Sequence, residues 1–296
     1  MDGIRQSMKK QVLSKEDSYD FFGKGTLSDL NLFNQKRDRF IKRVNLIISL
    51  ALNDFKSKYA SSQLGILWAF FKPVVQACVY VFVFTIIARA APANNQYPYA
   101  FWLLPGMIAW FFFSDGIMSG ANALLEYSYL VKKIKFDIGI LPTVKVISSG
   151  IVHCFFVLFV LFLYLLWGLP LCWTMIQIPY YMVCTFSIVV ALSKINCALV
   201  PFFRDFLQLL EIILMVLMWA CPVMWDVSML PEKIVSIFKL NPLYYVIEGY
   251  RQSFMGGGWF FNKPWMTVYY WGFVLLLWYL GNKLFSRLQV HFADIM

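Results

Sequence analysis

The amino-acid sequence predicts an all-α integral membrane protein with six transmembrane helices. Of its 296 residues, 60% are hydrophobic and 14% are charged, a balance that a water-soluble globule of this size could not hide. Apolar runs long enough to cross a hydrocarbon layer, which takes about 20 helical residues, recur along the chain. We place the six spans at residues 66–88, 100–125, 143–167, 175–200, 206–225 and 266–285.

The basic residues predict the orientation, because loops that stay in the cytoplasm are enriched in Lys and Arg. Residues 1–72 hold 13 of the 26 basic residues, and eight more follow the second, fourth and last spans, among them Lys145. The opposite side holds the other five. Both termini are therefore expected in the cytoplasm, and the net charge of +10 reflects membrane topology rather than nucleic-acid binding.

Residues 1–35 are too polar for a signal peptide, which needs an apolar core near the start, so we expect a cytoplasmic extension and assign it no role. The six cysteines occur singly in or beside apolar runs, without C-x-x-C spacing. This pattern favours packing over disulfide or metal roles, and no metal site is predicted.

The segment before the first span, residues 38–56, predicts an amphipathic helix. Apolar residues such as Phe40, Val44, Ile47 and Phe55 recur at spacings of three and four, with most charges elsewhere. Broken by charges, it is a poor span but suits a helix lying along the inner leaflet. The alternative is a cytoplasmic helix packed on its own protein.

The chain enters the first span through "SKYASSQLGILWAFFKP". Ser61 and Ser62 are expected to cap the helix, and Gly65 to permit a close turn or helix crossing. Trp68 suits headgroup depth. Pro73 and a lysine then fall inside the span.

Four stretches resemble permease subunits of ATP-binding-cassette polysaccharide exporters of the type 2 class. "SSQLGILW" followed by Pro73 resembles the family's S-x-L-G-x-x-W…P pattern at the first span. The second span and the loop after it are similar in "LLPGMIAWFFFSDGIMSGANALLEYSYLVKKIKFDIGILP". The fifth span and the connection after it are similar in "CPVMW" and "NPLYYVIEGYR". Asp137 departs from the family pattern, because many relatives have proline at this position, directly after the phenylalanine. The resemblance identifies residues 36–296 as the transmembrane domain.

The resemblance implies a complex of two permease copies and two separate ATPase subunits in the plasma (inner) membrane. In agreement, the chain has no G-x-x-x-x-G-K-[ST] loop to cradle nucleotide phosphates. We therefore expect no catalytic residue and no cofactor on this chain, with ATP and Mg bound by the partner subunit.

Residues 126–139 are the predicted contact with the ATPase, because apolar and aromatic residues are mixed with lysines in a short cytoplasmic connection. The alternative is a solvated basic turn. The residues predicted to make this contact are Glu126, Tyr127, Tyr129, Leu130, Lys132, Lys133 and Phe136.

The long connection at 226–264 resembles the family's pair of short re-entrant helices, although a plain extracellular loop is possible. Pro231 and Pro242 would begin the two helices, and the glycines at 256–258 would turn the chain back. We give structural roles to Asn241 before the second helix and to Glu248 and Arg251, which can pair at i, i+3.

A lipid-linked polymer carries a pyrophosphate and a sugar chain, so its path needs a cation near the inner mouth and aromatic faces beyond it. Lys72 is the predicted cation, with snorkelling to the interface as the alternative role. The aromatic residues assigned to the path are Trp68, Phe71, Tyr80, Trp219, Trp225, Tyr244 and Tyr245.

We therefore expect the permease of an ATP-driven exporter of a lipid-linked polysaccharide, with wall teichoic acid favoured and O-antigen or capsule next. One alternative is a membrane transferase acting on lipid-linked sugars, but the only histidines, His153 and His291, belong to no acid-base cluster. Another is a secondary transporter, for which the sequence shows no convincing internal repeat.

Overall fold

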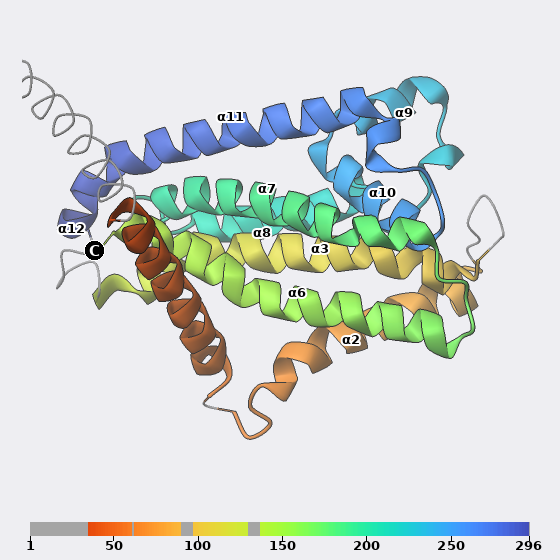
Figure 1. Cartoon of the computed structure of the whole chain (residues 1–296), viewed down its shortest axis with the longest axis horizontal. Coiled ribbons are helices and arrows are strands. Elements are labelled where there is room, and N and C mark those ends of the chain that lie inside the picture. Colours follow the sequence, from red (N-terminus) through yellow and green to blue (C-terminus); the bar gives the residue numbers. More distant parts are fainter. Residues whose placement is uncertain (1–34, 61, 90–96, 130–136, 296) are drawn as a thin grey trace, which may run out of the picture. The chain divides into compact units, whose positions relative to one another are not determined.

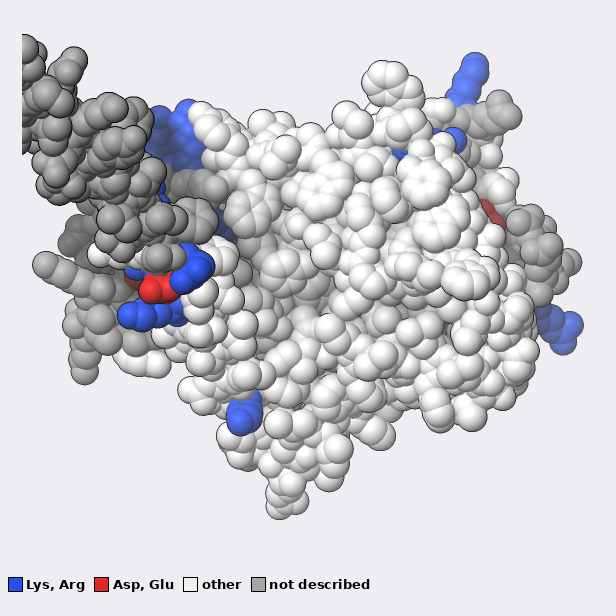
Figure 2. Space-filling view, viewed as in Figure 1, with Lys and Arg blue, Asp and Glu red and all other residues white. Residues whose placement is uncertain are grey.

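The computed structural model describes residues 35–60, 62–89, 97–129 and 137–295, and their regular structure is helical. Four helical stretches are long and apolar enough to cross a membrane: Leu67–Ile87, Tyr99–Ala121, Ile138–Leu166 and Trp173–Leu199. They coincide with the first four predicted spans. Figure 2 shows a wide surface without charged side chains in the middle of the face drawn. The protein is a multi-pass membrane protein.

The last two predicted spans are also helices, but neither is both long enough and apolar enough to count among these four candidate spans. Helix α8 (Phe206–Ala220) is apolar but has 15 residues, fewer than the roughly 20 that a hydrocarbon layer requires. Helix α11 (Pro264–Leu288) has 25 residues, many of them Tyr, Trp and polar. The total of six spans therefore stays a prediction.

The chain divides into two compact units, Met1–Ser49 and Leu50–Met296, and the boundary falls inside a helix at residues 35–59. In the first unit this helix exposes Phe40 and Ile48. In the second unit its last turns bury Ala51 and Phe55. These last turns therefore pack on their own protein, while the interfacial position of the helix stays a prediction.

Helix α3 (Tyr99–Ala121) is the centre of the second unit. Figure 1 shows it beside α6 (Leu141–Leu166) and α7 (Ile178–Leu199), which are its main packing partners. In the apolar window of α3, 78% of the residues are buried. In the first span, formed by α2 (Leu67–Phe82) and a π-helical turn (Val83–Ile87), the share is 6%. The first span is thus attached to the bundle by only a narrow contact.

Two glycines allow α3 and α7 to approach closely. A Cβ atom on Gly116 would lie 2.6 Å from Cγ1 of Val189. A Cβ atom on Gly120 would lie 2.4 Å from Cβ of Ser193. The Ser193 hydroxyl donates to the Gly116 carbonyl at 3.1 Å. Small residues and interhelical hydrogen bonds stabilise helix pairs in membranes, where the hydrophobic effect does not distinguish a neighbouring helix from lipid.

The connection before α11 contains the two predicted short helices. Pro231 is the N-cap of α9 (Glu232–Lys239), and Pro242 is the first residue of α10 (Pro242–Phe254). The Asn241 side chain caps α10 by accepting from the Leu243 N–H at 3.0 Å. Gly256 then turns the chain at φ +74°. The helices are present as expected, but their re-entry into the membrane stays a prediction.

Arg251 attaches α10 to the bundle. Its side chain is 3% exposed, its Nη2 donates to the Val223 carbonyl at 2.5 Å, and its guanidinium lies 3.7 Å from the centre of the Trp102 ring on α3. The predicted i, i+3 pair is present, with Nη1 3.9 Å from Oε2 of Glu248. A planar cation is suited to this site because it can stack and donate at the same time.

The expected serine cap of the first span is wrong for Ser62, while Ser61 lies outside the described residues. The N-cap of α2 is Ile66, without a capping side chain, and the Ser62 hydroxyl donates to the Tyr59 carbonyl at 3.3 Å. The reason is spacing: four turn residues, including Gly65 at φ +53°, separate Ser62 from the helix. The glycine does supply the predicted close turn.

We predict that Arg251→Lys will lower the free energy of unfolding by about 2 kcal/mol, because lysine cannot keep both the stacking and the charged hydrogen bond. Unfolding in mixed micelles titrated with sodium dodecyl sulfate measures this change. Arg287→Lys, on the exposed side of the last turn of α11, is the matched control and should change stability by less than about 0.5 kcal/mol. Equal effects of the two substitutions would contradict the anchoring role.

Candidate functional site

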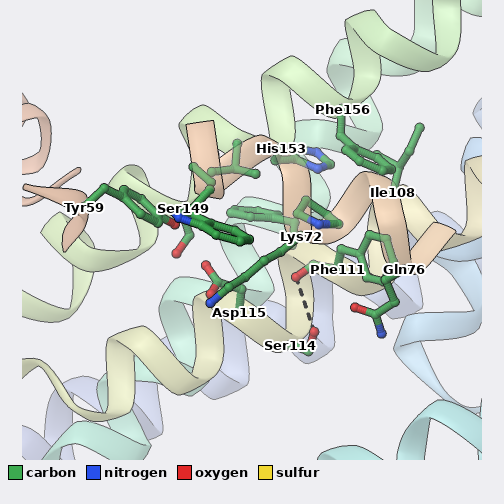
Figure 3. A pocket seen from close by; sticks show the side chains of 15 residues that line it. Tyr59, Lys72, Gln76, Ile108, Phe111, Ser114, Asp115, Ser149, His153 and Phe156 are labelled. Carbon is green, nitrogen blue, oxygen red and sulfur yellow. Dashed lines mark hydrogen bonds between the residues drawn. The ribbon is translucent and has the colours of Figure 1, made fainter. Parts of the chain in front are cut away.

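A cavity of about 200 Å³ lies between α2, α3, α6 and the residue that ends the helix at 35–59. Figure 3 shows its side chains. They are Tyr59, Trp68, Ala69, Lys72, Pro73, Gln76, Ile108, Phe111, Phe112, Ser114, Asp115, Ser149, Val152, His153 and Phe156.

The cavity has an exposed polar end and a buried polar end, with aromatic walls between them. Lys72, Gln76 and Asp115 are exposed, whereas Ser149 and His153 are 5% and 4% exposed. The aromatic side chains in the wall are Tyr59, Trp68, Phe111, Phe112 and Phe156. The site therefore combines a charged group, polar groups and an apolar surface, all of which a bound ligand could contact.

Of the charged groups at the exposed end, Lys58 and Asp115 form an ion pair. Nζ of Lys58 lies 3.4 Å from Oδ1 of Asp115 and 3.4 Å from Oγ of Ser119. Partial burial is the largest influence and acts to lower the pKa of Lys58, but Asp115, Tyr59 and Asp54 together outweigh it, so the pKa lies above its ordinary value. Lys72 extends toward Asp115 in Figure 3 but forms no ion pair with any residue that the structure describes. One cation thus remains available at this end.

The buried end is formed by two residues of α6, four positions apart. Nε2 of His153 is hydrogen-bonded to the Tyr250 hydroxyl at 2.9 Å, and its ring stacks on Phe112 with centroids 4.5 Å apart. These contacts fix the ring orientation. Nδ1 of His153 and Oγ of Ser149 have no hydrogen-bond partner among the described residues.

A second polar cluster surrounds Lys145 in the first turns of α6. Its Nζ lies 2.5 Å from Oδ1 of Asp54 and also contacts Oε2 of Glu126. The Tyr127 hydroxyl donates to the same Asp54 oxygen at 2.8 Å. The side chains of Lys145 and Asp54 are 6% and 7% exposed. The cluster joins the end of the helix at 35–59, α4 (Ala123–Glu126) and α6.

Three of the predicted ATPase contacts are described by the structure. Glu126 and Tyr127 belong to the Lys145 cluster, and Tyr129 is 57% exposed. The other predicted contacts lie outside the described residues: Leu130, Lys132, Lys133 and Phe136.

The residues predicted to line the substrate path do not share one cavity. Trp68 and Lys72 line the cavity at α2, Tyr80 accepts a hydrogen bond from Gln76 at 3.2 Å, and Phe71 is 57% exposed. They form one group on the first span.

The other four path residues lie elsewhere. Trp225 donates to the Trp219 carbonyl at 3.1 Å beyond the end of α8. Tyr244 is half-buried in α10, and Tyr245 is buried, with its hydroxyl 2.9 Å from that of Tyr180. Tyr245 is thus held within the helix packing.

Sequence reasoning missed Asp54, Ser149 and the position of Lys145. We counted Lys145 as a loop cation, but it is a buried residue of α6. The sequence did contain a sign of this, because Lys145 lies within a run that is otherwise apolar. A charged residue in such a run usually has a partner inside the protein. Asp54 lies 91 residues earlier, a separation across which sequence spacing cannot pair residues.

Comparison with known proteins gives matches over most of the chain. Residues 45–255 match the model of the ABC-2 type transporter family. Two O-antigen export system permease proteins RfbA from Klebsiella pneumoniae are each 27% identical over 263 residues, covering 85% of this chain and 95% of the relative. An O-antigen export system permease protein RfbA from Myxococcus xanthus is 28% identical over 214 residues, covering 71% and 80%. The similarity extends well beyond single motifs.

We predict that Lys145→Met will lower the free energy of unfolding by about 3 kcal/mol, because it leaves the Asp54 carboxylate buried without its cation. The double variant Asp54→Leu with Lys145→Met should recover part of this loss. Unfolding in dodecyl sulfate micelles measures both, with Lys283→Met on the exposed face of α11 as the matched control. A double variant that loses as much as the two single variants together would show that the pair is not coupled.

Proposed function

The chain belongs to the ABC-2 type transporter family, and from this premise we propose that it is the permease of an ATP-driven exporter of a lipid-linked cell-surface polysaccharide of the O-antigen kind. The observation that carries the proposal is the similarity to O-antigen export permeases over 85% of the chain. The relatives' names give wall teichoic acid no support, so O-antigen replaces it as the favoured substrate.

The proposed complex contains a second copy of this chain and two ATPase subunits, which bind ATP and Mg. Polar side chains on sparsely packed apolar helices support a shared path between two copies. Lys72 and Gln76 are exposed on α2, and Glu211 is exposed on α8. Charged residues inside spans usually face a protein partner or a water-filled cavity rather than lipid. Two copies would enclose such a path.

We place the complex in the plasma membrane with both chain termini in the cytoplasm. Residues 126–139 would then contact the ATPase subunit. Glu126 begins this segment and contacts the buried Lys145, so a displacement of the segment would reach α6 and, through Asp54, the helix that leads to the first span. The Lys145 cluster is therefore our proposed mechanical connection between ATP hydrolysis and the substrate path.

Deletion of the gene and complementation test the export function directly. Cells without the chain should retain lipid-linked polymer inside and lose it from the surface, and the restored chain should co-purify with a subunit that hydrolyses ATP. Normal surface polymer in the deletion strain would refute the proposal. ATP hydrolysis by the complex distinguishes it from a secondary transporter.

Leu130→Asp or Phe136→Asp should reduce surface polymer by roughly tenfold or more and weaken co-purification of the ATPase, because a charge replaces an apolar contact at the proposed interface. Val290→Asp, at an exposed residue near the C-terminus, is the matched control and should export normally. Unchanged assembly and export in both loop variants would remove residues 126–139 from the ATPase interface.

A further inference from the structure

The cavity between α2, α3 and α6 contains polar groups that the described structure does not satisfy. Oγ of Ser149 and Nδ1 of His153 are buried at its inner end without hydrogen-bond partners among the described residues. The Ile108 backbone lies close to the His153 ring, so Oγ of Ser149 is the atom of the two that has no nearby partner among the described residues. Buried polar groups in native proteins are almost always paired, and both residues line the cavity, so a group that enters it can supply a partner once the Ser149 hydroxyl turns toward it.

The size and walls of the cavity restrict what that partner can be. Its volume of about 200 Å³ is below the roughly 300 to 1,000 Å³ typical of clefts for drug-sized ligands, so it admits one ring-sized group rather than an oligosaccharide. Trp68, Phe111 and Phe156 supply apolar faces, while Ser149 and His153 supply a hydrogen-bonding end. A sugar ring matches this combination, because it has apolar faces and hydroxyl groups on its edge.

The exposed end adds a preference for negative charge. Asp115 is paired with Lys58, whereas Lys72 has no ion-pair partner in the described part of the chain. The three side chains together carry one net positive charge. An ammonium group suits a phosphate, which it binds as a point charge. Acyl chains would leave both polar ends unused, and inorganic phosphate would leave the aromatic walls unused.

We propose that this cavity binds a glycosyl phosphate, with the sugar ring against Ser149 and His153 and the phosphate at Lys72. The proposal deepens the proposed function and rests on it, because a lipid-linked polysaccharide carries this group where its first sugar joins the lipid diphosphate. The cavity then recognises the junction of lipid and glycan within one permease copy. The first span covers the cavity and is sparsely packed, so the ligand can enter from the membrane side by displacing few contacts.

Saturation-transfer difference NMR tests the site with the full chain in lipid nanodiscs, because the method detects weak binding. The probes are glucose 1-phosphate, glucose and inorganic phosphate. We expect transfer to the ring protons of glucose 1-phosphate and affinity about fivefold lower for glucose, which lacks the charged hydrogen bond to Lys72. Lys72→Gln should remove this difference between the two sugars.

Ser149→Leu should abolish the signal from both sugars, because the larger side chain fills the inner end and removes the hydroxyl. Ser187→Leu on α7, outside the cavity, is the matched control and should bind as the unaltered chain does. Absence of transfer to glucose 1-phosphate, or an unchanged signal in Ser149→Leu, would overturn the site. Surface polymer in the deletion strain is measured separately, so the site can fail while the export function stands.

Competition distinguishes the possible sources of the glycosyl group. A short-chain prenyl diphosphate glucose should displace glucose 1-phosphate, whereas glucosyl diacylglycerol, which lacks phosphate, should displace it about fivefold less well. Equal displacement by the two lipids would overturn the assignment of the phosphate to Lys72. Displacement by the prenyl diphosphate sugar alone would support the lipid–glycan junction as the ligand.

Discussion

The close approach of α3 and α7 is the constraint on which the rest of the bundle depends. In a bilayer a helix gains little by exchanging lipid for another apolar helix, so tight packing and interhelical hydrogen bonds must hold the pair together. Gly116 and Gly120 provide the space, and Ser193 provides the hydrogen bond. With this pair fixed, α3 is enclosed, and α6 and α10 pack on the surfaces that remain.

The buried cations show how this bundle accommodates charge. Arg251 is held by a carbonyl, an indole ring and a carboxylate, and Lys145 by two carboxylates. Each therefore has partners within the protein, as an apolar environment requires. Lys72 differs, because it lines a cavity and forms no ion pair with a described residue. This contrast separates structural cations from one available to a ligand.

Sequence patterns predicted the local features of the fold well. Apolar length located the first four spans, and the prolines at 231 and 242 marked the starts of α9 and α10, because both effects act within a few neighbouring residues. The serine cap failed because turn residues intervene before α2. The Lys145 cluster and the cavity could not be found in this way, since Asp54, Glu126 and Lys145 meet only after three helices have packed. Nothing in the sequence alone indicated that Oγ of Ser149 and Nδ1 of His153 would be buried without a hydrogen-bond partner among the described residues.

The sparse packing of the first span also bears on how such a protein can change over evolutionary time. Most residues of α3 cannot be replaced without disturbing several neighbours, whereas only Ala69 and Ala77 of α2 are buried. Substitutions at the exposed positions of α2 will therefore change the free energy of unfolding little. A lineage can change the exposed side of this helix while keeping the rest of the bundle unchanged. Tolerance to mutation is thus high in the helix that also supplies Trp68 and Lys72 to the cavity.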